Sequence, residues 1–514
     1  MRRPLLLLVL LALGISACGG SSATAGPAGG LPGDHPRWTP DPWAAASEAP
    51  ATAAPAGTPY DGVTYTDPGV NPFVPTDRDR ESTFALDVDT ASYAIAQRYV
   101  HDGTLPDPAS VRVEEFVNAF DQGYAPPRDD TFAVSGDGGP SPFLPRDEVL
   151  LRVGIQARVI DEEARKPAAL TFVIDTSGSM EREDRLGLVK RALTLLVEGL
   201  GRDDTVAIVT YGSDARVDLG PTPVRDADRI VEAIDALHTD GSTNAEAGLT
   251  LGYRLAADTL REGGINRVIL ASDGVANVGD TDPESILRHI SWDASLGVQL
   301  VTVGFGMGNY NDTLMEQLAD KGDGFYAYVN TLDDARSLFG SRLTSTLQSV
   351  ALDAKAQVEF DPAVVESYRL IGYENRDVAD NRFTDDSVDA GAIGAGHAST
   401  ALYALKLTGE GRAADRIATV RLRWSDPDGG RSRELAADVR VGDLADRFEA
   451  AAPAFRLDAL VAAAAEVFRQ SRWGDRYTLG DVAATADELT GALPRSEQAA
   501  AFLAFLRDAA RLDR

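Results

Sequence analysis

Between about residues 167 and 348, short apolar runs alternate with longer amphipathic stretches in a regular order. The apolar runs are nearly continuous, which is typical of strands that are covered on both faces. The stretches between them repeat apolar residues at helical spacing. This alternation predicts an α/β domain with a doubly wound, mainly parallel sheet. The predicted strands are ALTFVI, DTVAIVTY, NRVILAS, VQLVTVGF and GFYAYV, and the predicted helices include EDRLGLVKRALTLLVEGL, DADRIVEAIDAL, TNAEAGLTLGYRLAADTL, DPESILRHISW and YNDTLMEQLAD.

The chain on either side of this domain has different patterns. Residues 61–166 mix strand-like runs with short helical stretches and predict a small α+β accessory module. Residues 349–445 alternate apolar and polar positions between Gly and Asp turns, which is typical of an antiparallel sheet or sandwich. The last stretch, 446–514, is rich in alanine and predicts terminal helices.

The start of the chain has the order of an export signal. Arg2 and Arg3 precede an apolar run, Leu5 to Leu13. That run is too short for the ~20 residues of a membrane-spanning helix and is typical of a signal-peptide core. It is followed by ISAC, which resembles the lipobox of bacterial lipoproteins, whose cysteine carries the lipid. Because Cys18 is the only cysteine, we expect a lipid-anchored, extracytoplasmic protein without an intramolecular disulfide, in a membrane that the sequence does not specify.

A linker separates this signal from the folded part of the chain. Residues 19–60 are dominated by Ala, Pro, Gly, Ser and Thr, a composition that cannot bury enough apolar surface to offset its conformational entropy. The expected organisation is therefore a signal peptide with lipobox at 1–18, a flexible linker at 19–60, an accessory module at 61–166, the α/β domain at 167–348, a β-rich domain at 349–445 and a helical segment at 446–514.

The net charge of the chain limits the classes of partner that it is expected to bind. It has 79 acidic and 49 basic residues, and its formal net charge is -30. A field of this sign repels phosphate backbones, which argues against nucleic-acid binding. A cation or a basic partner is compatible with it, although solubility alone accounts for the acidity equally well.

Oxygen-bearing side chains follow three of the predicted strands. Asp175, Ser177 and Ser179 come after ALTFVI in a D-x-S-x-S arrangement, with no basic residue in the stretch TFVIDTSGSM. Thr243 precedes a predicted helix, and Asp273 follows VILAS. In a doubly wound sheet ligands bind beyond the carboxyl ends of the strands. Carboxylates and hydroxyls without thiol or imidazole favour a hard cation, Mg²⁺ or Mn²⁺, and an ion held mostly by neutral hydroxyls retains charge that attracts an outside carboxylate.

These five positions, taken in order, resemble the metal-ion-dependent adhesion site of the von Willebrand factor type A (VWA) domain. The resemblance implies that the serines and the threonine bind the ion directly or nearly so. It also implies that the aspartates bind directly or through water, and that an acidic side chain of a partner protein completes the coordination without catalysis. The stretches NPFVPTDRDRESTFALDVDTASYA, VRVEEFVNAFDQGY, VGFGMGNYNDTLMEQLADKGDGFYAYV and YRLIGYENR resemble a family of bacterial lipoproteins in which an N-terminal module and a C-terminal domain flank a VWA domain.

Three other interpretations remain open at this point. Each residue of the set could be a helix cap, although five such residues at strand ends favour a cation site. A metal-dependent hydrolase at the same loops would need a general base, and no residue stands out as one. The histidines are scattered and form no H-E-x-x-H motif. A small-solute-binding lipoprotein would usually have two similar lobes, whereas this chain predicts one sheet with unlike flanks.

The stretch LDVDTAS, around Asp87 and Asp89, also invites a chemical interpretation. It resembles the D-x-D-x-[TV] motif of haloacid-dehalogenase-type phosphatases, but its fifth position is Ala91. We expect Asp89, Thr90 and Ser92 instead to cap the helix that follows, with a second, weaker metal site as the alternative.

Overall fold

The computed structural model describes residues 52–53, 64–86, 89–273, 285–286, 288, 296–306, 312–341, 343–388, 390–428 and 430–513. The export signal, Cys18 and most of the linker lie outside these residues, as does Asp87. The chain divides into two units, and the description below concerns the larger one, Ala49–Arg514.

Six strands form the sheet of the α/β domain. Their order is β12-β11-β10-β7-β8-β9, and all neighbours are parallel except β8 and β9. The prediction of a doubly wound, mainly parallel sheet is confirmed. The strands are β7 (Ala168–Asp175), β8 (Thr205–Tyr211), β9 (Ala215–Pro223), β10 (Ile265–Ser272), β11 (Gln299–Phe305) and β12 (Phe325–Val329).

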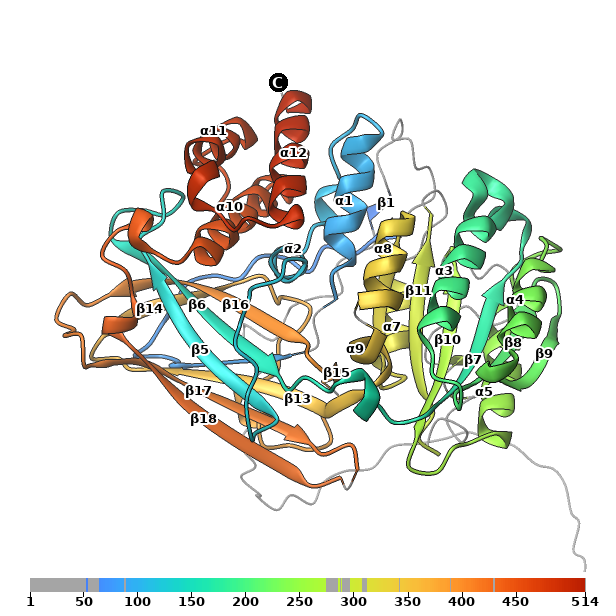
Figure 1. Cartoon of the computed structure of the whole chain (residues 1–514). Helices are drawn as coiled ribbons and strands as arrows, with labels where there is room; N and C mark the ends of the chain where they lie inside the picture. The colour runs from blue at the N-terminus through green and yellow to red at the C-terminus, as the bar shows by residue number, and fades with distance from the viewer. Residues whose placement is uncertain are drawn as a thin grey trace, which may run out of the picture. The chain divides into compact units, whose positions relative to one another are not determined.

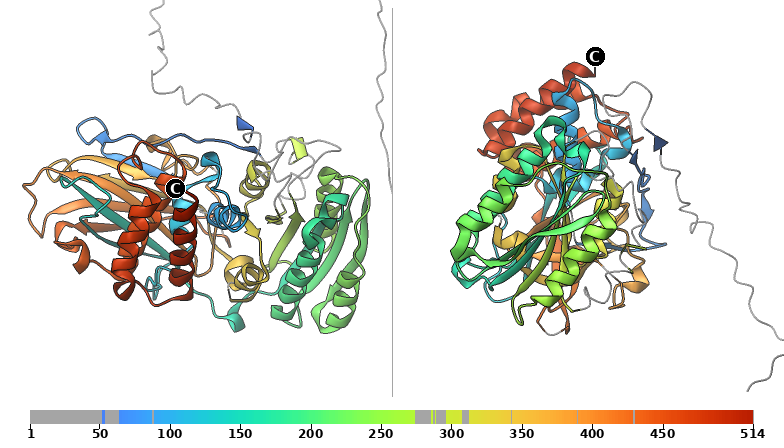
Figure 2. Two further views of the ribbon diagram at one scale, coloured as in Figure 1. Left: turned by 90° about the horizontal axis from the view of Figure 1, so that it is seen from above. Right: turned by 90° about the vertical axis from the view of Figure 1, so that its right-hand side faces the viewer.

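Helices cover both faces of this sheet, as the right-hand view of Figure 2 shows. On one face, the core contains side chains of α3 (Arg185–Gly199), α4 (Ala227–Asp235) and a terminal segment. That segment consists of α8 (Leu332–Arg336), a π-helical turn (Ser337–Ser341) and α9 (Leu343–Leu347). On the other face, α5 (Ala245–Asp258) and α7 (Asp312–Asp320) pack together with α1 (Ala91–His101). The predicted helix DPESILRHISW lies almost entirely outside the described residues.

The edge strand β9 is absent from the predicted strands. Only Leu219 and Thr222 of its sequence ARVDLGPTP are buried, and the other residues are exposed or half-buried. An edge strand open to water carries no apolar run, so hydrophobic periodicity does not detect it. Pro221 and Pro223, which lack a backbone N–H, are typical of such an edge.

Two five-stranded antiparallel sheets form a β-sandwich beside the α/β domain (Figure 1). One sheet has the order β3-β14-β16-β6-β5, and the other has β15-β13-β17-β18 with β4 also paired to β13. A single apolar core, which includes Leu151, Tyr403, Val358 and Val420, lies between them. The strands are β3 (Val74–Pro75), β4 (Glu81–Ala85), β5 (Phe132–Gly139), β6 (Glu148–Ala157), β13 (Ser349–Phe360), β14 (Val365–Ile371), β15 (Ala392–Gly394), β16 (Ala398–Leu407), β17 (Arg416–Ser425) and β18 (Ser432–Arg440).

This sandwich unites two segments that the sequence presents separately. The expected accessory module, 61–166, supplies β3 to β6, and the expected β-rich domain, 349–445, supplies β13 to β18. Strand β6 pairs with β16 over nine residue pairs, from Ala398–Gln156 to Lys406–Glu148. The two segments are therefore one folded body with the α/β domain inserted between them. Apolar alternation indicates that each run is a strand, but not which distant run is its partner.

A layer of helices covers the outer face of the sheet that contains β16. Their shared core includes Phe116, Phe455, Phe502 and Leu506, and it extends to Leu402 of β16. None of the helices in the described ranges is long and apolar enough to cross a membrane. The helices are α2 (Val113–Asn118), α10 (Pro453–Phe468), α11 (Leu479–Leu489) and α12 (Glu497–Leu512), with α1 at the same core. A short antiparallel pair is formed by β1 (Thr52–Ala53) and β2 (Thr64–Tyr65).

A core substitution tests whether the two segments fold as one body. Leu151 of β6 is fully buried between the sheets. We expect Leu151→Ala to lower the free energy of unfolding by about 2–5 kcal/mol, because it leaves a cavity in the shared core. The exposed Val159 is the matched control, and Val159→Ala should change stability by about 0.5 kcal/mol or less.

Urea unfolding measures both variants, and hydrogen exchange locates the effect. Leu151→Ala should weaken protection in β13 and β17 as well as in β5 and β6. Loss of protection confined to β5 and β6 would show that the two segments are separate modules.

Candidate functional site

The carboxyl ends of β7, β8 and β10 lie side by side at one edge of the α/β sheet. Strand β7 is bonded to β8 on one side and to β10 on the other. Asp175 is the register partner of Tyr211, and Ile174 is the partner of Ala271. The loops that leave these three strands therefore start from neighbouring positions, as expected for a site beyond the carboxyl ends of a parallel sheet.

The first loop holds Asp175, Ser177 and Ser179 together. Asp175 Oδ1 accepts a hydrogen bond from the backbone N–H of Ser177 at 2.8 Å, and the two serine hydroxyls are 3.0 Å apart. Asp175 is fully buried and Ser177 is nearly so. The D-x-S-x-S spacing thus brings one carboxylate and two hydroxyls into a single turn before α3.

The second loop carries Thr243, and it connects α4 to α5, whereas the sequence pattern predicts that it follows a strand. It lies beside the end of β8, because the N–H of Asn244 donates to the carbonyl of Gly212 at 2.9 Å, and it is also bonded to the first loop. The N–H of Asp240 donates to the carbonyl of Thr176 at 2.5 Å, and that of Gly178 donates to the carbonyl of Gly241 at 3.1 Å. Gly241 has a φ of 80°, which favours glycine. These backbone bonds fix the loop, and Thr243 is buried in it.

The third strand end contributes Asp273, whose side chain is fully buried. Its Oδ2 accepts a hydrogen bond from Arg185 Nη1 at 2.6 Å, and the two groups form an ion pair. Its Oδ1 has no hydrogen-bond partner among the described residues. A buried carboxylate oxygen without a hydrogen bond destabilises the folded state unless another group, such as a cation, contacts it.

Helix capping does not account for these residues. Asn244, not Thr243, is the N-cap of α5, and its side chain accepts from the N–H of Ala247. Ser177 precedes a 3₁₀ turn, and its side chain makes no capping hydrogen bond there. The hydroxyls of Ser177 and Thr243 therefore do not cap the helices that follow them.

Two buried carboxylates close to each other dominate the electrostatics of the site. Burial and, after it, the negative charge of Asp273 raise the pKa of Asp175 to about 6, and hydrogen bonds from Ser177 and Ser272 partly oppose this rise. Burial and then the charge of Asp175 hold the pKa of Tyr211 well above its usual range. The pocket therefore holds more negative charge than its hydrogen bonds offset.

Two further residues complete the site and were not among the predicted ones. Ser272 donates its hydroxyl to Asp175 Oδ2 at 2.8 Å, so both oxygens of that carboxylate have donors. The stretch TFVIDTSGSM contains no basic residue, and Arg185, which lies outside it, brings the positive charge that pairs with Asp273. Ser272 could have been noticed because it precedes Asp273 at a strand end. Arg185 has no such signal, since a basic residue at the start of an amphipathic helix is ordinarily solvent-exposed.

The expectation that Asp89, Thr90 and Ser92 cap α1 is wrong. Thr90 is the N-cap residue, but its side chain makes no capping hydrogen bond. The N–H of Ser92 donates to Glu115 of α2 at 2.8 Å. Asp89 instead accepts from the N–H of Tyr326 at 3.1 Å and from Arg376 at 2.8 Å. Tertiary partners that lie far away in sequence thus replace the local cap.

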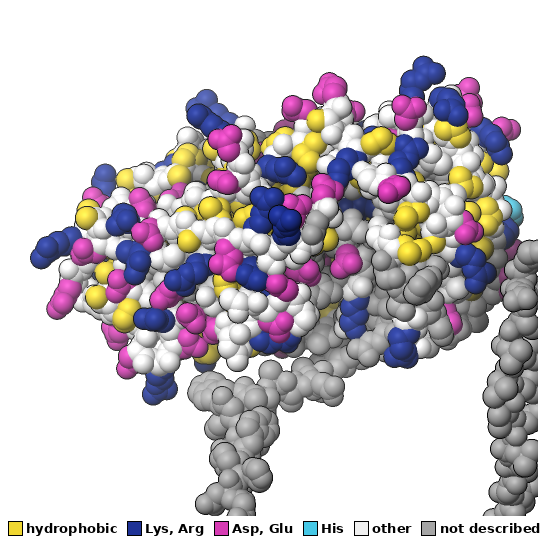
Figure 3. Space-filling model, turned by 90° about the horizontal axis from the view of Figure 1, so that it is seen from below, with side chains coloured by type: hydrophobic (Ala, Val, Ile, Leu, Met, Phe, Trp, Pro, Cys, Tyr) yellow, Lys and Arg dark blue, Asp and Glu magenta, His cyan; other side chains and the backbone are white. Residues whose placement is uncertain are grey.

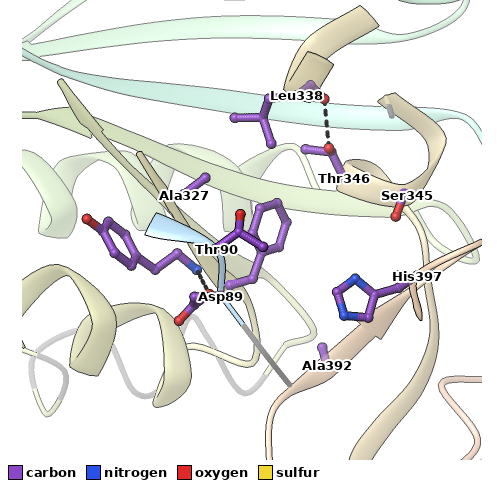
Figure 4. A pocket seen from close by; sticks show the side chains of 11 residues that line it. Asp89, Thr90, Ala327, Leu338, Ser345, Thr346, Ala392 and His397 are labelled. Carbon is purple, nitrogen blue, oxygen red and sulfur yellow. Dashed lines mark hydrogen bonds between the residues drawn. The ribbon is translucent and has the colours of Figure 1, made fainter. Parts of the chain in front are cut away.

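A separate hollow lies near the amino end of β12, away from the candidate site. Asp89, Ala327, Leu338, Thr346 and His397 are among the side chains that line it (Figure 4). Its volume is about 60 Å³, which is room for about two water molecules. A hollow of this size does not hold an organic substrate. Within the described ranges, no three or more His, Cys, Asp or Glu side chains gather in a way that could hold a metal ion.

The excess negative charge is not gathered on the face that Figure 3 shows. Acidic and basic side chains are interspersed there, over the whole described surface in view. Pairs such as Arg423 with Asp386, and Arg433 with Asp426, illustrate how exposed charges of the sandwich are matched. The surface of this face therefore offers no single large acidic patch as an alternative binding site.

Three protein-family models match successive parts of the chain. Residues 60–151 match the model described as von Willebrand factor, residues 169–341 the von Willebrand factor type A domain, and residues 345–512 the model described as uncharacterized protein YfbK, C-terminal. The uncharacterized protein YfbK of Escherichia coli (strain K12) is 39% identical over 403 residues, which are 73% of this chain and 70% of that protein. The chain belongs to the YfbK family of VWA-domain proteins.

Two other relatives are more distant. An uncharacterized protein of Synechocystis is 28% identical over 298 residues, or 57% of this chain and 70% of that protein. A solved structure described as von Willebrand factor type A from Catenulispora acidiphila covers 70% of this chain and 82% of its own, with 16% identity and a TM-score of 0.41. The names of the YfbK relatives give no catalytic activity, and VWA domains commonly mediate protein interactions.

The raised pKa of Asp175 predicts a pH dependence of stability in the metal-free protein. Its folded-state pKa of about 6 lies above the value of about 3.9 for an unfolded aspartate. The folded state therefore holds this proton more tightly, and the stabilisation it gives is present below about pH 4 and lost as the pH rises through about 6. Asp175→Asn cannot ionise, so it should gain about 2–3 kcal/mol relative to the wild type between about pH 4 and pH 7.

Urea unfolding in the presence of a chelator measures this difference at each pH. Asp235→Asn, at an exposed position on α4, is the matched control and should show no pH-dependent gain. A difference between Asp175→Asn and wild type that stays constant across this pH range would contradict the electrostatic description of the site.

Proposed function

We propose that this protein binds a partner protein through a Mg²⁺ or Mn²⁺ ion held at the carboxyl edge of its VWA domain. The residues that would hold the ion are Asp175, Ser177, Ser179, Thr243 and Asp273. The observation that carries the proposal is the pair of buried carboxylates, of which one has a raised pKa and the other an oxygen without a hydrogen-bond donor. A cation between them would remove both penalties.

The donor set supports a hard divalent cation. Every candidate ligand is a carboxylate or hydroxyl oxygen, and neither cysteine nor histidine is among them. Such a set matches the oxygen ligands of Mg²⁺ and Mn²⁺ and is unsuited to zinc or copper. When bound, the ion would supply an electrophilic centre for a carboxylate of the partner.

The same arrangement supports binding rather than catalysis. Neither a histidine nor a lysine is present in the loop residues 175–180 and 240–244. Both oxygens of Asp175 accept hydrogen bonds, from Ser177 and Ser272, and Asp273 Oδ2 pairs with Arg185. The remaining oxygen, Asp273 Oδ1, is assigned to the ion in this proposal, so neither carboxylate is left to act as a general base for a hydrolase.

We also propose that the protein acts at the cell envelope. The basic start, the apolar core and the lipobox that ends at Cys18 support export and a lipid anchor. The linker, 19–60, would then let the folded unit reach away from the membrane surface. The partner would be an extracytoplasmic protein with an exposed acidic side chain.

Metal titration tests the ion site directly. Isothermal titration with Mg²⁺ should give one site in the wild type. Asp175→Ala should weaken this binding by about a hundredfold or more while leaving the fold intact, because it removes a charged ligand. Asp240→Asn, at an exposed acid in the Thr243 loop, is the matched control and should bind Mg²⁺ as the wild type does.

Cross-linking of the lipoprotein in its own envelope tests the partner. A protein caught by the wild type with Mg²⁺, and lost on adding a chelator or in Asp175→Ala, is the expected result. Equal capture with and without metal would show that the partner does not bind through this ion.

A further inference from the structure

Arg185 occupies a fixed position beneath the candidate ion site. It is the first residue of α3, and only about 3% of its side chain is exposed. Its Nη1 lies 2.6 Å from Asp273 Oδ2. A Cβ atom at Gly306, which follows β11, would collide with the guanidinium Nε, so the side chain packs against the Gly306 backbone. Arg185 is thus held between the ends of β10 and β11.

The charge of this guanidinium changes the balance of the site. Asp175 and Asp273 would neutralise a divalent cation completely, because the other three candidate ligands are neutral hydroxyls. The positive charge of Arg185 offsets part of the negative charge that Asp273 brings to the site. A divalent ion would therefore be neutralised less completely than by the same ligands without Arg185, in a buried environment where charge interactions are stronger than in water.

We propose that Arg185 is a resident counter-charge that keeps a bound divalent ion under-neutralised, so that the ion selects a carboxylate from the partner. This inference rests on the proposed function, since it assigns a partner-selecting role at the same ion site. Arg185 binds one oxygen of Asp273 and leaves Oδ1 for the ion. The arginine therefore weakens the affinity for the metal alone and strengthens the affinity of the metal-loaded site for an anion. It is a positioning residue, because it acts through Asp273 and the ion.

Charge removal separates this role from a purely structural one. Arg185→Gln keeps a hydrogen-bond donor near Asp273 but removes the charge, and Arg185→Lys keeps the charge. A counter-charge predicts that the glutamine variant binds metal more tightly and that the lysine variant resembles the wild type. A merely structural clamp predicts that the glutamine variant binds metal no better than the wild type.

The test uses Mn²⁺ alone as the metal and acetate as the carboxylate probe. Electron paramagnetic resonance measures free Mn²⁺, and water-proton relaxation measures how much acetate displaces water from the bound ion. We expect Arg185→Gln to lower the Kd for Mn²⁺ by about tenfold and to weaken acetate binding to the loaded site by a similar factor. Arg185→Lys should stay within about threefold of the wild type in both quantities.

A second substitution keeps the test decisive if Arg185→Gln does not fold. Arg185→Met also removes the charge and keeps an unbranched stem against Gly306. It should likewise tighten Mn²⁺ binding and weaken acetate binding. If neither charge-removing variant binds Mn²⁺ more tightly than the wild type, or if acetate binding is not weakened, the counter-charge role is overturned.

Asp175→Ala in the same experiment distinguishes the two proposals. If Asp175→Ala binds Mn²⁺ as tightly as the wild type, the ion site itself is wrong. If Asp175→Ala loses Mn²⁺ while Arg185→Gln fails to tighten it, the ion site stands and only the role of Arg185 is overturned.

Discussion

The carboxyl edge of the α/β domain depends on one constraint, the burial of Asp175 and Asp273 close together. Two adjacent carboxylates removed from water repel each other and lose hydration, and each needs compensating partners. Ser272 and the Ser177 backbone supply donors to Asp175, and Arg185 supplies a positive charge to Asp273. The tight D-x-S-x-S turn, the inward-facing strand-end serine and the buried arginine can all be understood as responses to this burial. The compensation is incomplete, and the proposed cation would complete it.

A second set of buried charges joins the α/β domain to the rest of the unit. The carboxylate of Glu316 in α7 lies 3.2 Å from Arg112 Nη2 and 3.4 Å from Arg376 Nη2. Arg376 Nη2 also pairs with Asp89 Oδ2 at 2.8 Å. Asp89 in turn accepts from the N–H of Tyr326 in β12. Buried ion pairs add little net stability because desolvation offsets their attraction, but removing one partner costs about 3–5 kcal/mol, since the other charge is left buried and unpaired. Such a network therefore opposes any packing of these elements that would leave one of its charges buried without its partner.

Much of this organisation could be predicted from the sequence, because local patterns determine it. The buried parallel strands have continuous apolar runs, and Asp175 and Asp273 stand at the ends of two of them, so position alone points to these two residues. Thr243 lies between α4 and α5, and the resemblance to the VWA domain is needed to indicate it. The unpredicted features depend on contacts distant in sequence. No periodic pattern in the sequence indicates that β6 pairs with β16, that Arg185 forms an ion pair, or that the N–H of Tyr326 donates to Asp89. Side-chain type shows what a residue can bind, and only the fold shows which neighbour it meets.

The direction of the strands determines where these two sets of charges lie. Near the amino end of β10, Arg267 donates to the carbonyl of Leu347 at 2.8 Å, at the point where the chain leaves the α/β domain. Tyr326 is likewise near the amino end of β12. Asp273 follows the carboxyl end of β10, at the opposite edge of the sheet. The sandwich is thus attached at the amino edge, and loop residues such as Gly178 at the carboxyl edge remain exposed. Because a parallel sheet separates its two edges, a partner could contact the proposed ion site without displacing the contacts that hold the unit together.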